Sequence, residues 1–279
     1  MSQAPETATN HCYRHPNRQS FVLCQRCGRT ICGECQTPGP VGVICPECMK
    51  QQRAAAPKTR PAILTRMTGS GAPVVTYALI GICVIVFILQ SLPGIGGNVT
   101  AGLQYAGLYS YPELFQPWRM ITSIFAHASI IHIALNMYTL WIFGMLLEPL
   151  LGRVRYLVLF LMSGFAGSLG VYLISDPRVP VIGASGAIFG MMAAFLIIQR
   201  RLGGNATQLL ILVGINLVIG FIPGLQIAWQ AHVGGLVGGA IVGLIFVETR
   251  QRSRRGLQVG LLCLLGALMI AASLWRFFA

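Results

Sequence analysis

Seven long apolar tracts constrain this chain more than any other feature. A helix needs about 20 apolar residues to cross a hydrocarbon core of roughly 30 Å, and the sequence offers the following tracts: 74–92, about 122–147, 156–175, about 185–198, 207–222, about 229–247 and 257–275. Lipid satisfies no backbone polar group, so each tract is predicted to be helical. The chain is 54% hydrophobic and only 10% charged, whereas an average soluble domain has roughly 25% charged residues. The sequence therefore predicts an all-α polytopic membrane protein.

The basic residues between the tracts predict an orientation. If the amino terminus lies inside, the cytoplasmic loops carry Arg153, Arg155, Arg200, Arg201, Arg250, Arg252, Arg254 and Arg255. The outer loops then carry little more than Arg119 and Arg178. Because basic residues stay on the cytoplasmic side, we expect a multi-pass protein of the cell membrane with its amino terminus in the cytoplasm and its carboxyl terminus outside. The formal net charge of +13 is then a topology signal, and no nucleic-acid partner is expected.

A few polar residues stand within or at the ends of these tracts. His132 and Asn136 are four residues apart and share one face of a helix. Ser185 opens the fourth tract, and His232 lies near the start of the glycine-rich sixth tract. Ionisable groups at membrane depth are functional candidates, although a membrane serine usually bonds back to its own helix and a membrane histidine usually satisfies a polar neighbour.

The order of the tracts brings these polar groups to one level. The second, fourth and sixth tracts run in the same direction, so their starts lie near the same, outer face. Glycines on two of these tracts allow close helix packing, and Ser185 and His232 are expected to approach the roughly 2.6–3.2 Å at which a base activates a serine. His132 and Asn136 could donate to a developing oxyanion. No acid lies at that level, which excludes a Ser-His-Asp triad and leaves a dyad.

These residues belong to motifs that resemble the rhomboid intramembrane serine proteases over about residues 74 to 250. The motifs are Trp118-Arg119, His132-x-x-x-Asn136, Gly183-Ala184-Ser185-Gly186 and Ala231-His232-x-x-Gly235-x-x-x-Gly239. The resemblance implies a six-helix core in which Ser185 is the nucleophile and His232 the general base. It also implies an oxyanion hole formed by His132, Asn136 and the backbone amide of Ser185.

The same resemblance implies supporting roles for other residues. Gly183 would lie in the turn that exposes Ser185, Arg119 would fix a membrane-embedded hairpin in the loop 93–119, and Glu148 would be a structural acid. The seventh tract is an addition to the six-helix core and carries no catalytic candidate. His127 is expected to be structural.

The resemblance implies an intramembrane serine endopeptidase that cleaves transmembrane protein substrates near the outer membrane face, with no cofactor for catalysis. The alternative is an inactive rhomboid-like protein that binds transmembrane client proteins without cutting them. Loss of Ser185 or His232 would indicate that alternative, and the sequence has both residues. A transporter would need ionisable residues near the bilayer midplane, and these tracts have almost none.

The amino-terminal region contains four pairs of metal-ligand residues. They are Cys12-x-x-His15, Cys24-x-x-Cys27, Cys32-x-x-Cys35 and Cys45-x-x-Cys48. A two-residue gap allows both members of a pair to bind one zinc ion at roughly 2.0–2.3 Å, and a reducing cytoplasm disfavours disulfides. Eight ligands suit two structural zinc ions. The spacing resembles B-box-type zinc fingers, which implies that the first and third pairs share one ion and the second and fourth pairs the other; sequential pairing is the alternative.

The sequence thus predicts four segments. Residues 1–50 form a cytoplasmic, B-box-like zinc-finger domain that takes its folding energy from metal and is a candidate binding module for a cytoplasmic protein partner. Residues 51–73 form a linker, residues 74–250 the rhomboid-like protease core, and residues 251–279 an extra carboxyl-terminal transmembrane helix.

Overall fold

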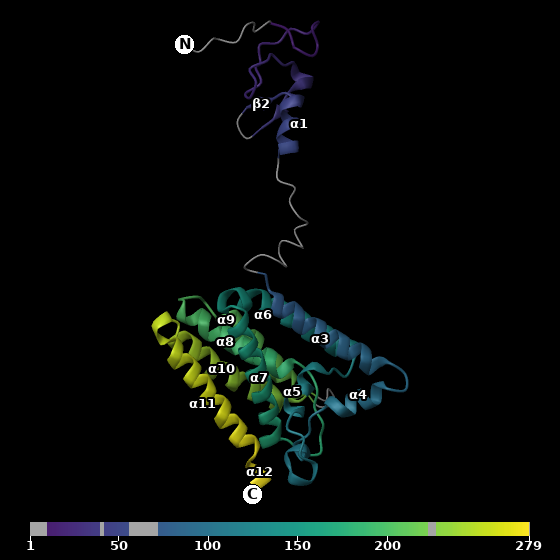
Figure 1. Cartoon of the computed structure of the whole chain (residues 1–279), viewed down its shortest axis with the longest axis vertical. Helices are drawn as coiled ribbons and strands as arrows, with labels where there is room; N and C mark the ends of the chain where they lie inside the picture. Colours follow the sequence, from purple (N-terminus) through teal and green to yellow (C-terminus); the bar gives the residue numbers. More distant parts are fainter. Residues whose placement is uncertain (1–9, 40–41, 56–71, 223–226, 279) are drawn as a thin grey trace. The chain divides into compact units, whose positions relative to one another are not determined.

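The chain forms two compact units, Met1–Leu64 and Thr65–Ala279. The structure is a computed structural model that describes residues 10–39, 42–55, 72–222 and 227–278 (Figure 1). Most of the predicted linker, residues 56–71, lies outside the described residues.

The first unit is small and has little regular structure. It contains η1 (Gly33–Cys35), β1 (Thr37–Pro38), β2 (Val43–Ile44) and α1 (Pro46–Ala55). The two strands pair antiparallel, with Thr37 opposite Ile44. Its buried cluster consists of Ile31 and six cysteines, Cys12, Cys24, Cys32, Cys35, Cys45 and Cys48. Such a unit buries too little apolar surface to offset its chain entropy without added cross-links or metal.

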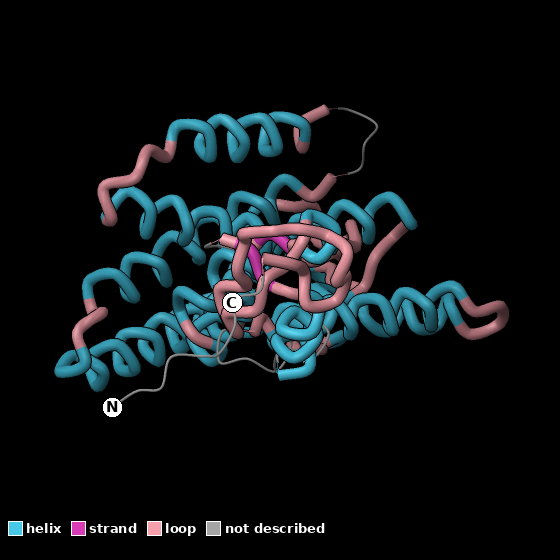
Figure 2. Tube along the Cα trace, turned by 90° about the horizontal axis from the view of Figure 1, so that it is seen from above, coloured by secondary structure: helices cyan, strands magenta, loops and turns pink. Residues whose placement is uncertain are grey.

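The second unit is helical, and helices dominate the whole trace (Figure 2). Its long helices are α3 (Val74–Ser91), α6 (Ile130–Leu151), α7 (Arg153–Ile174), α8 (Ser185–Arg201), α9 (Thr207–Ile219), α10 (Trp229–Glu248) and α11 (Arg255–Ser273). The shorter helices are α4 (Gly96–Leu103), η2 (Gly107–Ser110), η3 (Pro112–Leu114), α5 (Arg119–Thr122), η4 (Ser123–Phe125), η5 (Arg252–Arg254) and α12 (Trp275–Phe278). Each of the seven apolar tracts therefore contains one long helix, as predicted.

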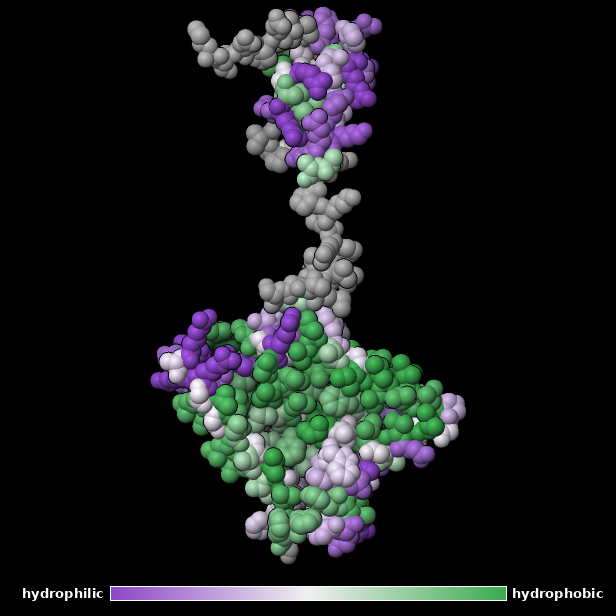
Figure 3. All heavy atoms as spheres, in the orientation of Figure 1, coloured by the Kyte–Doolittle hydropathy of each residue, from purple (hydrophilic) through white to green (hydrophobic). Residues whose placement is uncertain are grey.

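Five of these helices, α3, α6, α7, α10 and α11, are long and apolar enough to cross a membrane by length and composition. The helix α8 has 17 residues and α9 has 13, which correspond to about 25 and 20 Å. Ten of the 17 residues of α8 are buried, so this helix is surrounded by protein more than by lipid. Hydrophobic side chains cover the visible flank of this unit, and hydrophilic residues gather toward its ends (Figure 3).

The second tract differs from the prediction at its start. We expected a helix from about Thr122, but α5 and η4 end at Phe125 and α6 begins only at Ile130. Ser129 is the residue before α6, with φ −157°, and its hydroxyl accepts a bond from the backbone N–H of His132. A serine side chain that satisfies a free amide favours a helix start, and the apolar tract alone does not show this break.

Glycines allow the closest helix contacts in the core. The helix α10 packs mainly against α8 and α7, and a Cβ added at Gly235 would overlap the backbone carbonyl of Gly186. A Cβ at Gly239 would likewise overlap the backbone of Gly190. Contacts this close fix α10 against α8, as small residues do at membrane helix interfaces.

Glu148 joins α6 to the start of α3. Its carboxylate, 2% exposed, accepts bonds from the backbone amides of Val75 (2.8 Å) and Thr76 (2.7 Å) and from the Thr76 hydroxyl (2.7 Å). The first amides of a helix have no partner within the helix and attract negative charge. The carboxylate therefore caps α3 from a neighbouring helix.

We expect Glu148→Gln to destabilise the protein by about 1–3 kcal/mol. The substitution removes the negative charge, and it replaces one carboxylate oxygen with an NH2 group that cannot accept the hydrogen bonds of the α3 amides. The measurement is the unfolding midpoint in detergent. Glu113→Gln changes an exposed acid in η3 and should leave the midpoint unchanged. Equal midpoints for both variants would contradict the capping role.

Candidate active site and metal clusters

Ser185 lies at the first residue of α8. Gly183, two residues earlier, has a φ of 132°, a conformation that L side chains rarely adopt. Its amide donates to the carbonyl of Ser123 at 2.9 Å, which ties the turn to η4. The turn thus leads into α8 so that Ser185 remains half-buried at the helix end.

His232 of α10 contacts Ser185 directly. Its Nε2 lies 3.0 Å from Ser185 Oγ, within hydrogen-bond distance. The imidazole is 7% exposed and stacks on the ring of Phe189, with centroids 4.2 Å apart and an angle of 13° between the planes. Among the described residues, Nδ1 of His232 has no hydrogen-bond partner. The pair thus forms a serine–histidine contact without a third, acidic member there.

His132 of α6 approaches this pair, and Asn136 lies one turn further along the same helix. A Cβ added at Gly183 would lie 2.8 Å from Nε2 of His132 and 3.8 Å from Ser185 Oγ, so the imidazole and the hydroxyl converge on the same small space. Asn136 is buried, and its side-chain amide donates to the carbonyl of His132 at 2.9 Å.

We expect Gly183→Ala to lower the peptide-bond hydrolysis that the rhomboid resemblance implies by about 100-fold without unfolding the protein. A methyl group would displace His132 and strain the turn, and small misplacements at a reacting centre are costly. Gly203→Ala is the matched control: Gly203 also has a positive φ, 79°, but a Cβ there meets no atom within 4 Å. Cleavage assays of both variants check this. Equal rates for the two variants would contradict the idea that the space beside His132 matters.

Arg119 connects separate parts of the long loop between α3 and α6. Its guanidinium donates to the carbonyls of Ala101 and Gln104 and to the side chain of Gln116, and it lies 4.2 Å from the ring centre of Tyr109. These contacts connect separate parts of the loop, and the role of Arg119 in fixing a membrane-embedded hairpin stays a prediction. Trp118 precedes α5 and is 56% exposed, so it makes no comparable contribution to the core.

Two residues near the site were not singled out as site residues from the sequence. Phe189 is four residues after Ser185, and that spacing on one helix face was a usable signal for the ring that stacks on His232. His127 is 2% exposed, and its ring centre lies 5.1 Å from that of His132. Its backbone amide donates to the side chain of Gln90. No local pattern predicts the contact of His127 with Gln90, which lies 37 residues earlier in the chain.

The first unit contains two clusters of possible metal ligands. One consists of Cys12, His15, Cys32 and Cys35, and the other of Cys24, Cys27, Cys45 and Cys48. The structure thus brings together the first and third pairs and the second and fourth pairs, and the sequential pairing is not observed.

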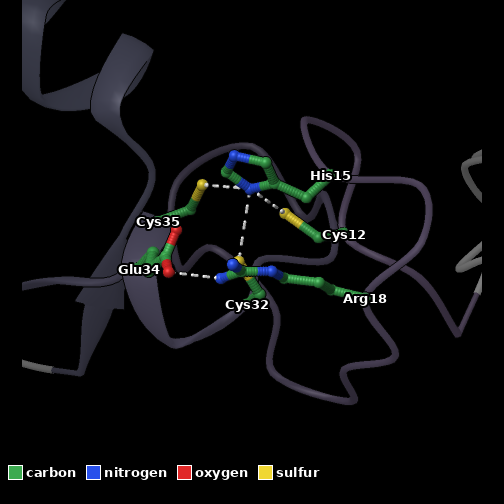
Figure 4. A network of polar contacts seen from close by, with 6 residues as sticks. All are labelled: Cys12, His15, Arg18, Cys32, Glu34 and Cys35. Carbon is green, nitrogen blue, oxygen red and sulfur yellow. Dashed lines mark hydrogen bonds and ion pairs between the residues drawn. The ribbon is translucent and has the colours of Figure 1, made fainter.

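The distances in these clusters fit a tetrahedral zinc ion. Standard Zn–N and Zn–S bonds place neighbouring N and S ligands about 3.5 Å apart and two sulfurs about 3.8 Å apart. His15 Nδ1 lies 3.8, 3.4 and 3.4 Å from the sulfurs of Cys12, Cys32 and Cys35 (Figure 4). In the other cluster the sulfurs of Cys27 and Cys45 are 3.8 Å apart. Both clusters could hold a metal ion, and soft sulfur ligands favour zinc among the common metals.

The electrostatics of the thiols also fit a cation. Burial raises the pKa of the Cys12 thiol, but backbone N–H groups and His15 outweigh it and lower this pKa to about 6. The pKa of Cys35 rises to about 11 because it is buried beside Cys12 and Cys32, and that of Cys48 rises to about 12 for similar reasons. One thiolate thus forms easily and disfavours ionisation of its neighbours. A divalent cation at the centre removes this conflict.

Comparisons with known proteins agree with this architecture. A family model described as the Rhomboid domain matches residues 114–249. The chain is 33% identical over 179 residues to Rhomboid protease GluP of Bacillus subtilis, an alignment covering 61% of this chain and 34% of GluP. It is 35% identical over 169 residues to RHOMBOID-like protein 6, mitochondrial, of Arabidopsis thaliana, covering 56% and 53% of the two chains. This chain thus spans a third to a half of the length of these two relatives.

A third relative is matched over most of its length. "Putative rhomboid protease YdcA" of Bacillus subtilis is 31% identical over 140 residues, which cover 48% of this chain and 70% of YdcA. The helices and the polar groups between them define a polytopic helical membrane protein with a serine–histidine contact in its core. The chain belongs to the rhomboid family, whose members are generally intramembrane serine proteases.

Proposed function

We propose that this protein is an intramembrane serine endopeptidase that hydrolyses peptide bonds of transmembrane proteins. The observation that carries the proposal is the 3.0 Å contact between Ser185 Oγ and His232 Nε2. A histidine at this distance can accept the serine proton as the oxygen attacks a carbonyl. A protein that only binds clients has no need for this contact, so the contact favours hydrolysis.

The mechanism needs four steps from the residues of this chain. His232 Nε2 takes the hydroxyl proton while Ser185 Oγ attacks the scissile carbonyl, and a tetrahedral intermediate forms. The protonated His232 then gives the proton to the leaving amine, which departs as the acyl-enzyme forms. In the third step water attacks the acyl carbonyl while Nε2 takes its proton, and a second tetrahedral intermediate forms. In the fourth step Nε2 returns this proton to Ser185 Oγ as the ester bond breaks, which releases the carboxylic acid product and restores the serine. Nδ1 keeps its own proton throughout, and Phe189 holds the ring in its plane.

The negative charge of the intermediate requires donors. Ser185 begins α8, so its backbone amide belongs to the first turn, whose N–H groups are free of helical partners and lie at the positive end of the helix dipole. His132 and Asn136 are the side-chain donors that we assign to the same oxyanion. Together they form a site of the type that contributes several kcal/mol to acyl transfer.

Location near the helix ends explains how water could reach the site. Ser185, His232 and His132 all lie in the first turn of their helices, and helix ends lie nearer the membrane surface than the bilayer centre. We propose that this end faces outside, with the amino terminus in the cytoplasm and the carboxyl terminus outside, since the arginine distribution favours that orientation.

Within the first unit, residues 1–50 are proposed to be a cytoplasmic zinc domain with two structural ions and no part in hydrolysis. Residues 51–73 would be the linker, residues 74–250 the protease core, and residues 251–279 the extra helix. We also propose that the zinc domain binds a cytoplasmic protein.

The function is tested by reconstituting the full chain in lipid vesicles with a fluorescent transmembrane substrate. Cleavage by the natural sequence is expected, and His232→Ala should reduce it by at least about 10³-fold, because the serine then lacks its base. His11→Ala, in the first unit, serves as the matched control. No cleavage by any variant, with tight substrate binding, would favour the client-binding alternative.

A further inference from the structure

A groove of about 860 Å³ is lined by the end of α6, by α7 from Arg153 to Met162 and by α11 from Arg255 to Cys263. Its volume is within the roughly 300–1,000 Å³ of sites that bind small molecules. It lies away from the candidate active site. Gly167 of α7 packs beside Gly186, next to Ser185, and is 12 residues after Arg155, which corresponds to about 18 Å along the helix.

Three arginines surround the groove: Arg153 and Arg155 from α7 and Arg255 from α11. Among the described residues, the ion pairs are Arg18–Glu34 and Arg201–Glu248, so none of the three is neutralised by an acid. Glu148 also lines the groove, but its carboxylate is engaged with the start of α3. Three guanidinium groups against this one carboxylate leave the lining with a net positive charge.

The walls below the arginines are apolar. On α7, Val158 and Met162 lie three and seven residues after Arg155, and on α11 Val259 and Leu262 lie four and seven residues after Arg255. Residues at these spacings share one helix face. Both α7 and α11 begin at the basic end of the groove. Each helix therefore has an arginine in its first turn and apolar residues in the following turns.

We propose that this groove binds an anionic phospholipid, with its phosphate headgroup on Arg153, Arg155 and Arg255 and an acyl chain along the apolar stripes of α7 and α11. Two observations support the inference: the positive charge of the rim complements a phosphate, and the apolar walls begin directly beside the arginines. A basic rim at the level of lipid headgroups attracts anionic lipid, and the apolar walls continue in the direction that an acyl chain takes. A free phosphate ion would use the arginines but not the walls.

The test uses the full chain in detergent and native mass spectrometry, with dioleoylphosphatidylglycerol, dioleoylphosphatidylcholine and inorganic phosphate as probes. The natural sequence is expected to retain phosphatidylglycerol about tenfold more tightly than phosphatidylcholine. Arg153→Gln/Arg155→Gln/Arg255→Gln should remove that preference. The matched control, Arg200→Gln/Arg250→Gln/Arg252→Gln, removes three arginines that do not line the groove and should keep it.

A second variant tests the site in case the triple arginine variant does not fold. Leu262→Trp fills the apolar wall, leaves every arginine in place and should also weaken phosphatidylglycerol retention about tenfold. Equal retention by the natural chain and Leu262→Trp, or by the two triple variants, would overturn the lipid site. Displacement of phosphatidylglycerol by millimolar inorganic phosphate would assign the site to a free anion and would also overturn the proposal.

Discussion

Ser185→Ala is expected to reduce cleavage of a transmembrane substrate by at least about 10³-fold while the protein remains folded. The Oγ of Ser185 is the atom that forms the covalent bond in the proposed mechanism, and only background catalysis from binding and the oxyanion donors remains without it. The rate is measured with reconstituted protein under single-turnover conditions, which separates chemistry from product release.

Ser163→Ala is the matched control for this variant. Ser163 lies on α7, is 0% exposed, and its hydroxyl has no partner among the described residues, so its removal should leave the rate within about twofold and the stability equal or higher. If Ser185→Ala keeps more than a tenth of the original rate, Ser185 is not the nucleophile.

Removal of metal is expected to unfold the first unit. Apart from Ile31, its buried cluster is made of cysteines, so little apolar burial remains when the ligands separate. Structural zinc contributes an apparent binding free energy of about 10–16 kcal/mol in comparable small domains, far more than such a unit could otherwise supply. Full-length protein should contain about two zinc ions per chain by elemental analysis, and a strong chelator should make residues 10–55 susceptible to protease.

Two double variants separate the pairing schemes. Cys12→Ala/Cys35→Ala alters one cluster only if the pairs alternate as observed, so about one zinc ion should remain. Cys12→Ala/Cys27→Ala alters both clusters and should leave about none. Sequential pairing predicts the reverse for these two variants. Cys263→Ser, outside both clusters, should retain the full zinc content, and a content near zero in the unaltered, reduced protein would contradict a zinc domain.

Much of the candidate site could be predicted from the sequence because membrane depth reduces the problem to one dimension. Tract order and the arginine pattern gave the direction of each helix, and direction gave the level of Ser185, His232 and His132. The glycine spacing on α10 then indicated close packing on α8. These signals can be read from short stretches of sequence, so they do not require knowledge of how the core packs.

The remainder depends on three-dimensional packing. The approach of His132 to the turn at Gly183 and the stack of Phe189 on His232 each bring together segments that are distant in sequence. The late start of α6 at Ile130 reflects a serine cap within an apolar tract, where the hydrophobic pattern continues and masks the break. In the first unit, ligand spacing predicted two sites but left the pairing open, because either pairing satisfies the same local geometry.

The most direct measurement for the central claim is covalent labelling of the folded full chain with a fluorophosphonate probe, read by peptide mass spectrometry. A single adduct on Ser185 is expected, reduced by at least about 100-fold in His232→Ala, because the serine reacts only when the imidazole removes its proton. No adduct on Ser185, or equal labelling with and without His232, would contradict a serine activated by its neighbouring histidine.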